Sequence, residues 1–254
     1  MSKLWVVAHD IHWPKTNLRA LGAMLSFLKE NEIEGFVFGG DQFDNECISH
    51  HTSGKGFYRP RRAFQRDERG FDEQVLGPVE RAVGRNARRV YIIGNHERFE
   101  HDFVESHPEL EGVIDHTVGL RLEARGWKIV PLGHAYKIGK LHVIHGEVLT
   151  GIGNQAGMYP SRKAVELYAA NVLAGHTHAP QSFTRISPVE KTQKWMGWIA
   201  PILGNVNPEY LRNRPTAWAN GFTVVEGRGD GNFNCYPILI HEGKFSFGGR
   251  TYGA

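Results

Sequence analysis

Five short polar clusters, each directly after a short apolar run, constrain this chain more than any other feature of its sequence. In chain order they are Asp10-Ile11-His12, Gly40-Asp41, Gly94-Asn95-His96-Glu97, His145-Gly146 and Gly175-His176-Thr177-His178. The runs before them have the length and β-rich composition of strands, and they span residues 4–8, 36–38, 90–93, 141–144 and 171–174. Because sites in open α/β sheets form at the carboxyl ends of strands, the clusters predict a single shared site.

The segments between these strands predict a layered α/β fold in one domain, residues 1–254. Apolar residues recur at helical spacing in four stretches, which are 18–30, 71–83, 97–105 and 161–170. The tail after residue 222 has the alternation of antiparallel strands. Residues 45–70 show no clear period, so we expect a long loop or insertion there.

The composition excludes several classes of protein. An apolar content of 41% over 254 residues is typical of a globular chain that buries a core. The two cysteines, Cys47 and Cys235, are too few for a disulfide framework or a thiolate metal site. No apolar run approaches the roughly 20 residues of a membrane span, and the N-terminus lacks a signal-peptide pattern. We therefore expect a cytoplasmic protein that has no membrane partner, and its oligomeric state stays open.

The residue types in the clusters predict a metal site. Imidazole, carboxylate and amide oxygen together suit Mn²⁺, Fe, Zn²⁺, Ni²⁺ or Co²⁺. Residues two apart on an extended segment point to the same side, so Asp10 and His12 can face one ion, as can His176 and His178. The glycines before Asp41, Asn95 and His176 permit close backbone approach.

The ordered motifs Asp-x-His, Gly-Asp, Gly-Asn-His-Glu, His and Gly-His-x-His resemble the signature of the calcineurin-like metallophosphoesterases, over residues 10–178. The resemblance implies a four-layer α/β/β/α sandwich of two packed mixed β-sheets flanked by helices. It also implies two divalent metal ions, with manganese expected first. By the resemblance, one ion would be held by Asp10, His12 and His178, the other by Asn95, His145 and His176, and Asp41 would bridge both. His96 would be the acid that protonates the leaving oxygen, or a contact to the phosphate.

Three departures from two well-known branches of the family narrow the resemblance. His12 is followed by Trp13-Pro14 and not by the glycine of the Ser/Thr protein phosphatases, and Asp44-Asn45-Glu46 replaces their Asp-Arg-Gly. Asp44 also stands where purple acid phosphatases have a tyrosine, so a tyrosine–iron(III) centre is not expected. The small bacterial and phage-type phosphoesterases remain.

We expect a two-metal phosphoesterase that hydrolyses its substrate by attack of a metal-bound hydroxide. Two ions about 3.5–4 Å apart can clamp an in-line displacement at phosphorus and lower the pKa of a bound water. The stretch 55–69 is basic and interleaved with aromatics, which favours a phosphodiesterase acting on a nucleotide or nucleic acid. The candidate substrate-binding residues are His50, His51, Arg59, Arg61 and Arg62.

Other interpretations remain open at this point. The basic stretch can equally be a solvated loop that Asp67 and Glu68 partly neutralise. The same ligand set would serve a phosphomonoesterase with a small or protein substrate. A non-catalytic metal-binding scaffold is the third alternative, although such a protein would be expected to lack His96 or some ligands. Trp195, Trp198 and Trp218 are expected to pack in the core or at its edges.

Overall fold

The computed structural model describes residues 3–52, 54, 60–150, 158–212 and 214–253. Its larger sheet has six strands in the order β11-β10-β1-β2-β3-β4. The strands are β1 Lys3–Ala8, β2 Ile33–Phe38, β3 Arg88–Ile92, β4 Trp127–Val130, β10 Gly221–Gly227 and β11 Phe233–Leu239. β1 to β4 pair in parallel, and β10 and β11 extend the sheet in antiparallel fashion from β1. The sheet is therefore mixed.

The second sheet is also mixed and has the order β5-β6-β7-β9-β8. Its strands are β5 Tyr136–Ile138, β6 Leu141–Ile144, β7 Asn171–Ala174, β8 Gln181–Ile186 and β9 Lys194–Ile199. The three central strands pair in parallel, and the two edge strands are antiparallel. A small hairpin of β12 Phe245–Phe247 and β13 Arg250–Tyr252 closes the chain.

The alternation of side chains along β1 explains why the sheets pack against each other. Trp5 and Val7 point into the apolar layer between the two sheets, whereas Val6 and Ala8 point into the layer beneath the helices. Successive strand residues face opposite sides, so a strand that is apolar at every position must be covered on both faces. One face of the larger sheet therefore takes up the helices and the other takes up the second sheet.

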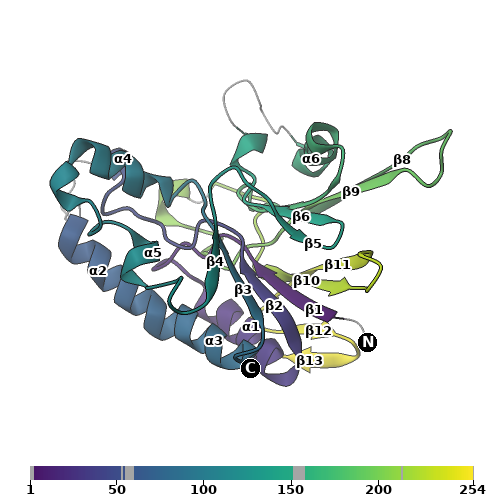
Figure 1. The fold of residues 1–254 in the computed structure, drawn as a ribbon, viewed down its shortest axis with the longest axis horizontal. Coiled ribbons are helices and arrows are strands. Elements are labelled where there is room, and N and C mark those ends of the chain that lie inside the picture. Colours follow the sequence, from purple (N-terminus) through teal and green to yellow (C-terminus); the bar gives the residue numbers. More distant parts are fainter. Residues whose placement is uncertain (1–2, 53, 55–59, 151–157, 213, 254) are drawn as a thin grey trace.

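Helices cover the outer faces of both sheets (Figure 1). The α-helices are α1 Leu18–Glu30, α2 Pro60–Phe71, α3 Gly77–Val83, α4 Arg98–Ser106, α5 His116–Gly119 and α6 Pro160–Tyr168. A π-helical turn, η2 Asp72–Leu76, joins α2 to α3. Short 3₁₀ turns are η1 His50–Thr52, η3 Pro108–Leu110, η4 Glu147–Leu149 and η5 Glu209–Leu211. α1, η2 and α3 pack on the larger sheet and α6 packs on the smaller one, which confirms the expected four layers.

The interpretation of residues 45–70 as a loop is wrong for residues 60–70. These residues form α2, which runs without a break through η2 into α3. The polar stretch concealed the helix because, among the described side chains of α2, only Phe64 and Phe71 are fully buried between long charged side chains. Strands β8 and β9 were also not predicted, since most side chains of β8 are exposed.

Among the described residues, no helix is long and apolar enough to cross a membrane.

Candidate metal centre

The five polar clusters converge where the carboxyl ends of the two sheets meet. Those that follow β1, β2 and β3 come from the larger sheet, and those that follow β6 and β7 come from the smaller one. Hydrogen bonds join the sheets at this edge. His9 Nε2 lies 3.1 Å from the carbonyl oxygen of Ile144, and the amide of His176 donates to Asp10 Oδ2 at 3.0 Å. The predicted site is therefore one place in the fold, at the seam between the sheets.

Asp10, His12 and His178 form the first group of metal-binding side chains. Their ligand atoms all lie within 4.8 Å of one another, and all three residues are buried. His178 Nε2 is 3.3 Å from Asp10 Oδ1 and 3.2 Å from His12 Nε2. One carboxylate oxygen and two imidazole nitrogens thus face a common point, although His178 is 166 positions from His12 in the sequence.

Asp41, His145 and His176 form the second group, with ligand atoms again within 4.8 Å of one another. His145 Nε2 lies 3.3 Å from Asp41 Oδ1 and 2.9 Å from Asn95 Oδ1, which brings the predicted amide ligand to the same place. His176 Nε2 contacts the hydroxyl of Thr150 at 2.6 Å. All the ligand-type residues predicted for the second ion therefore lie together.

Asp41 lies between the two groups. Its Oδ1 faces His145, whereas its Oδ2 is 4.0 Å from His12 Nε2 and 3.9 Å from His96 Nε2. The position of this carboxylate is the one that a bridging ligand would need.

The hydrogen bonds of the imidazoles indicate which ring nitrogen carries the proton. The Nδ1 atoms of His96 and His145 lie 3.0 Å and 3.3 Å from the carbonyl oxygens of Asp44 and Gly39, and His12 Nδ1 lies 3.4 Å from Asp44 Oδ1. An oxygen beside Nδ1 keeps the proton there and turns the Nε2 lone pair toward the centre, as in known metal sites. Imidazoles that can turn Nε2 toward two carboxylates form a donor set that fits divalent ions of the nitrogen- and oxygen-binding class.

The backbone at the site is held in a rarely populated conformation. Five of the seven predicted ligands have positive φ: Asp10 53°, His12 49°, Asp41 53°, His176 64° and His178 61°. Residues other than glycine seldom occupy this region, and such strain concentrates at functional sites. Packing of the two sheets offsets the local free-energy cost of these positive φ angles and holds the ligands in place.

Two of the glycines that precede predicted ligands are required by close packing. A Cβ atom at Gly94 would lie 2.2 Å from Asp41 Oδ1, and one at Gly175 would lie 2.5 Å from Asp10 Oδ2. Any side chain at these positions would displace a carboxylate of the centre. The prediction of close backbone approach is therefore confirmed.

The electrostatics of the centre in the metal-free protein favour charged carboxylates. Burial opposes ionisation of Asp41, but the nearby charges of His145 and His96 outweigh it and hold the pKa of Asp41 well below its usual value. His178 does the same for Asp10, whose pKa is also lowered. Burial opposes protonation of His145, yet the charge of Asp41 raises its pKa to about 10. Two buried anions that attract every nearby positive charge are the environment that a pair of cations would stabilise.

His96 lies beside both groups and is more exposed than His12, His145 and His178, with 27% of its side chain accessible. Its ring packs edge-on against that of His12, with 4.8 Å between centroids. Burial favours the neutral ring, but the charges of Asp41 and Asp44 outweigh it and raise the pKa of His96 above its ordinary value. A larger fraction of His96 is therefore protonated near neutral pH than of a free histidine.

Glu97 organises the loop that carries Asp41, a role that the motif alone did not reveal. Its buried carboxylate accepts backbone N–H bonds from Gly94 at 2.8 Å, Asp41 at 3.1 Å, Gln42 at 2.7 Å and Phe43 at 3.1 Å. One acidic side chain thus holds the ends of β2 and β3 together.

Replacing Glu97 with glutamine should lower the free energy of unfolding by about 3 kcal/mol, because the amide NH₂ would face two buried N–H donors and leave them unsatisfied. Urea unfolding of the metal-free protein measures the change. Glu105→Gln, at an exposed position of α4, is the matched control. A loss below about 1 kcal/mol for Glu97→Gln would show that the loop does not depend on this carboxylate.

Sequence reasoning missed several other residues around the centre. Asp44 forms an ion pair with Lys15, with 2.8 Å between Oδ2 and Nζ. Its Oδ1 lies against the ring of His12, so Asp44 orients a predicted ligand. Asn45 donates to the carbonyl oxygen of His96 at 3.0 Å and to the buried Glu100 at 3.1 Å. Their position directly after Asp41 in the sequence was the available signal.

Trp218 packs beside the metal centre. It is half-buried, and its ring meets that of His178 edge-on at 4.3 Å between centroids. Trp198, in contrast, is buried between the sheets as expected. No pattern in the sequence around Trp218 indicated that this segment returns to the metal centre.

The predicted substrate-binding residues are only partly described. Arg59 lies outside the described residues, as do the side chains of Arg61 and His51. Arg62 is exposed in the first turn of α2. His50 lies on η1, with its ring edge-on to Phe99 at 5.9 Å between centroids. Substrate binding by this set stays a prediction.

Comparison with known proteins shows distant similarity along the whole chain. No protein-family model matches it. The gene 54 proteins of mycobacteriophages D29 and L5 are 24% and 22% identical to it, each over 99% of both chains. Among solved structures, vacuolar protein sorting 29 of Cryptosporidium parvum aligns with 100% of this chain and 99% of its own, at 11% identity and a TM-score of 0.48. A metallophosphoesterase of Sphaerobacter thermophilus aligns over 92% and 88%, at 16% identity and a TM-score of 0.42. At this level of similarity, the function must be inferred from the residues of the site.

Proposed function

We propose that this protein is a metal-dependent phosphoric ester hydrolase of the calcineurin-like type, and that it cleaves phosphodiesters of a nucleotide or nucleic acid. The observation that carries the proposal is the pair of side-chain groups, Asp10-His12-His178 and Asp41-His145-His176, which meet at Asp41. The family resemblance of the motifs supports the same assignment.

Two divalent ions, with Mn²⁺ proposed first, would neutralise charge on the phosphate and activate a water for attack on phosphorus. Asp10, His12 and His178 would hold one ion, and Asn95, His145 and His176 the other, with Asp41 shared.

His96 is the group that we propose as the proton donor to the leaving oxygen. Its Nδ1 is fixed by the carbonyl oxygen of Asp44, so its Nε2 faces the centre beside Asp41. In the metal-free protein, the charges of Asp41 and Asp44 raise the pKa of His96, which is the direction that suits a general acid. A merely phosphate-binding role is the alternative for the same atom.

The diester assignment rests on the basic stretch 55–69, whose arginines match a phosphate-rich substrate. A phosphomonoesterase would use the same two ions and stays the second candidate. A non-catalytic scaffold is disfavoured, because such a protein would have no need of the proton donor that the fold holds beside the ligands.

Turnover after metal exchange tests the proposal. The protein is stripped with a chelator, reloaded with Mn²⁺, and given bis-p-nitrophenyl phosphate or p-nitrophenyl phosphate. We expect the diester to have the higher kcat/KM and the stripped protein to be inactive on both. Faster turnover of the monoester would identify a phosphatase. Cleavage of neither ester by protein that has taken up metal would refute the enzyme assignment.

A further inference from the structure

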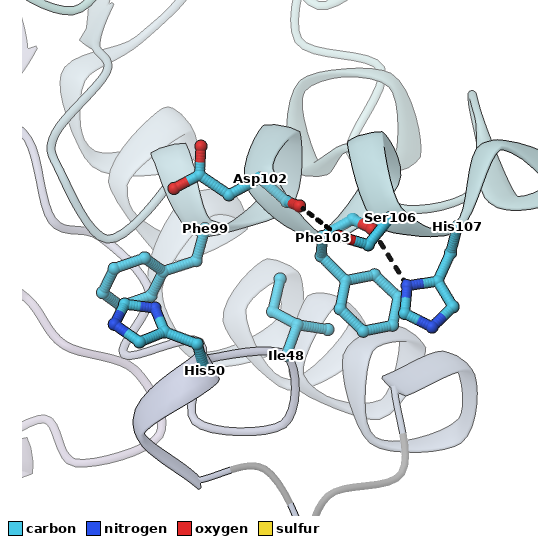
Figure 2. Close-up of a pocket in the computed structure, with 7 residues that line it drawn as sticks. All are labelled: Ile48, His50, Phe99, Asp102, Phe103, Ser106 and His107. Carbon is cyan, nitrogen blue, oxygen red and sulfur yellow. Dashed lines mark hydrogen bonds between the residues drawn. The ribbon is translucent and has the colours of Figure 1, made fainter.

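A small cavity lies beside the metal centre, between η1 and α4 (Figure 2). Its volume is about 130 Å³. Figure 2 shows Ile48 at its centre, Phe99 and His50 on one side, and Phe103 and His107 on the other. Its wall therefore combines aromatic and aliphatic side chains with two imidazoles, the hydroxyl of Ser106 and the acidic residue Asp102.

The Phe99 side chain links the cavity to the metal centre, because it lines the cavity and also packs against His96. The Phe99 ring lies 5.0 Å from that of His96 and 5.9 Å from that of His50, measured between centroids. The three rings thus form a row that begins at His96, the proposed proton donor, and ends at His50, which lines the cavity. A group attached to the leaving oxygen that His96 protonates would extend along Phe99 toward this opening.

The size and the lining select one kind of occupant. An apolar cavity of roughly 150 Å³ can take up a benzene ring, so a cavity of about 130 Å³ suits one planar ring. Phe103 and Ile48 are buried and give the wall a fixed shape, and aromatic walls favour a flat π-system. Polar edges of that ring could meet His50, His107 or the hydroxyl of Ser106.

We propose that this cavity binds the single-ring base of the nucleoside on the leaving side of the scissile diester. This inference rests on the proposed phosphodiesterase function. It assigns a binding site to the leaving nucleoside and gives a reason for preference of a nucleic-acid substrate over a simple alkyl ester.

The test measures how tightly the leaving-side product binds, first in a direct binding experiment and then as inhibition of hydrolysis. Thymidine and its base-free analogue 1,2-dideoxyribose are compared by ligand-observed NMR on the metal-loaded protein, and then as inhibitors of bis-p-nitrophenyl phosphate hydrolysis. We expect thymidine to bind at least ten times more tightly than the base-free sugar.

Ser106→Trp places an indole at the rim of the cavity and should abolish the preference for thymidine. Glu105→Trp adds the same indole one residue earlier on α4, outside this cavity, and should leave the preference intact. His50→Leu, at an exposed position, should weaken the preference without filling the space, which provides a second test should the tryptophan variant fold poorly.

The outcomes distinguish this inference from the proposed function. Equal binding of thymidine and the sugar, or equal effects of the two tryptophan variants, would overturn the base site even when the diester is hydrolysed. Failure to hydrolyse bis-p-nitrophenyl phosphate would count against the proposed function, and with it against the cavity as a leaving-group site, whatever thymidine does.

Discussion

Asp41→Asn is expected to lower kcat/KM for bis-p-nitrophenyl phosphate by at least about 100-fold and to reduce the number of metal ions bound per chain. Asp41 is the only one of the predicted ligands whose two carboxylate oxygens face different groups, with His145 beside Oδ1 and with His12 and His96 beside Oδ2. Asparagine keeps the size of the side chain but removes the anion that both ions would share. Stabilisation by metal ions contributes several kcal/mol to such reactions, and each 1.4 kcal/mol corresponds to a tenfold change in rate.

Metal content by mass spectrometry and steady-state kinetics, both on Mn²⁺-loaded protein, measure this prediction. The variant should still fold, because the backbone amide of His96 that now donates to Asp41 Oδ1 at 2.9 Å can donate to the asparagine oxygen. Asp230→Asn, in the exposed turn between β10 and β11, controls for loss of a negative charge. If Asp41→Asn keeps both its metal and its rate, Asp41 is not a shared ligand.

His96→Ala is expected to have an effect that depends on the leaving group. Loss of a general acid typically costs about 10²- to 10⁴-fold. That loss should appear in full with a dinucleotide, whose alkoxide must be protonated as it departs. It should be much smaller with bis-p-nitrophenyl phosphate, because p-nitrophenolate is a stable anion and leaves without a proton.

The comparison of the two substrates separates the possible roles of His96. Equal losses on both would assign the residue to phosphate binding, and a fall in metal content would make it a ligand, since His96 also lies within reach of His12 and Asp41. His101→Ala removes an imidazole from the exposed face of the neighbouring helix and should change neither rate. A full rate on the dinucleotide in His96→Ala would exclude the residue from proton transfer.

Much of the fold was predictable because its strands and helices carry clear local patterns. β1, β2, β3, β6 and β7 coincide with five apolar runs of the sequence, since strands buried on both faces are apolar at nearly every position. α2 escaped prediction because few of its side chains enter the core. β8 was not predicted because it is an edge strand with mostly exposed side chains, so its sequence lacks the alternation of apolar and polar residues that marks a buried strand.

The sequence by itself determined which side chains can form the centre and at which strand ends they stand. Ligand type, spacing and the preceding glycines are local properties, and they can be seen without coordinates. Only the tertiary structure decided how those strand ends meet. It brought His178 to within 3.3 Å of Asp10, set Glu97 against the loop of Asp41, returned Trp218 to His178 and opened a cavity beside Phe99. These contacts join residues far apart in the chain, and packing of the two sheets and their connecting loops, which no local pattern encodes, determines them.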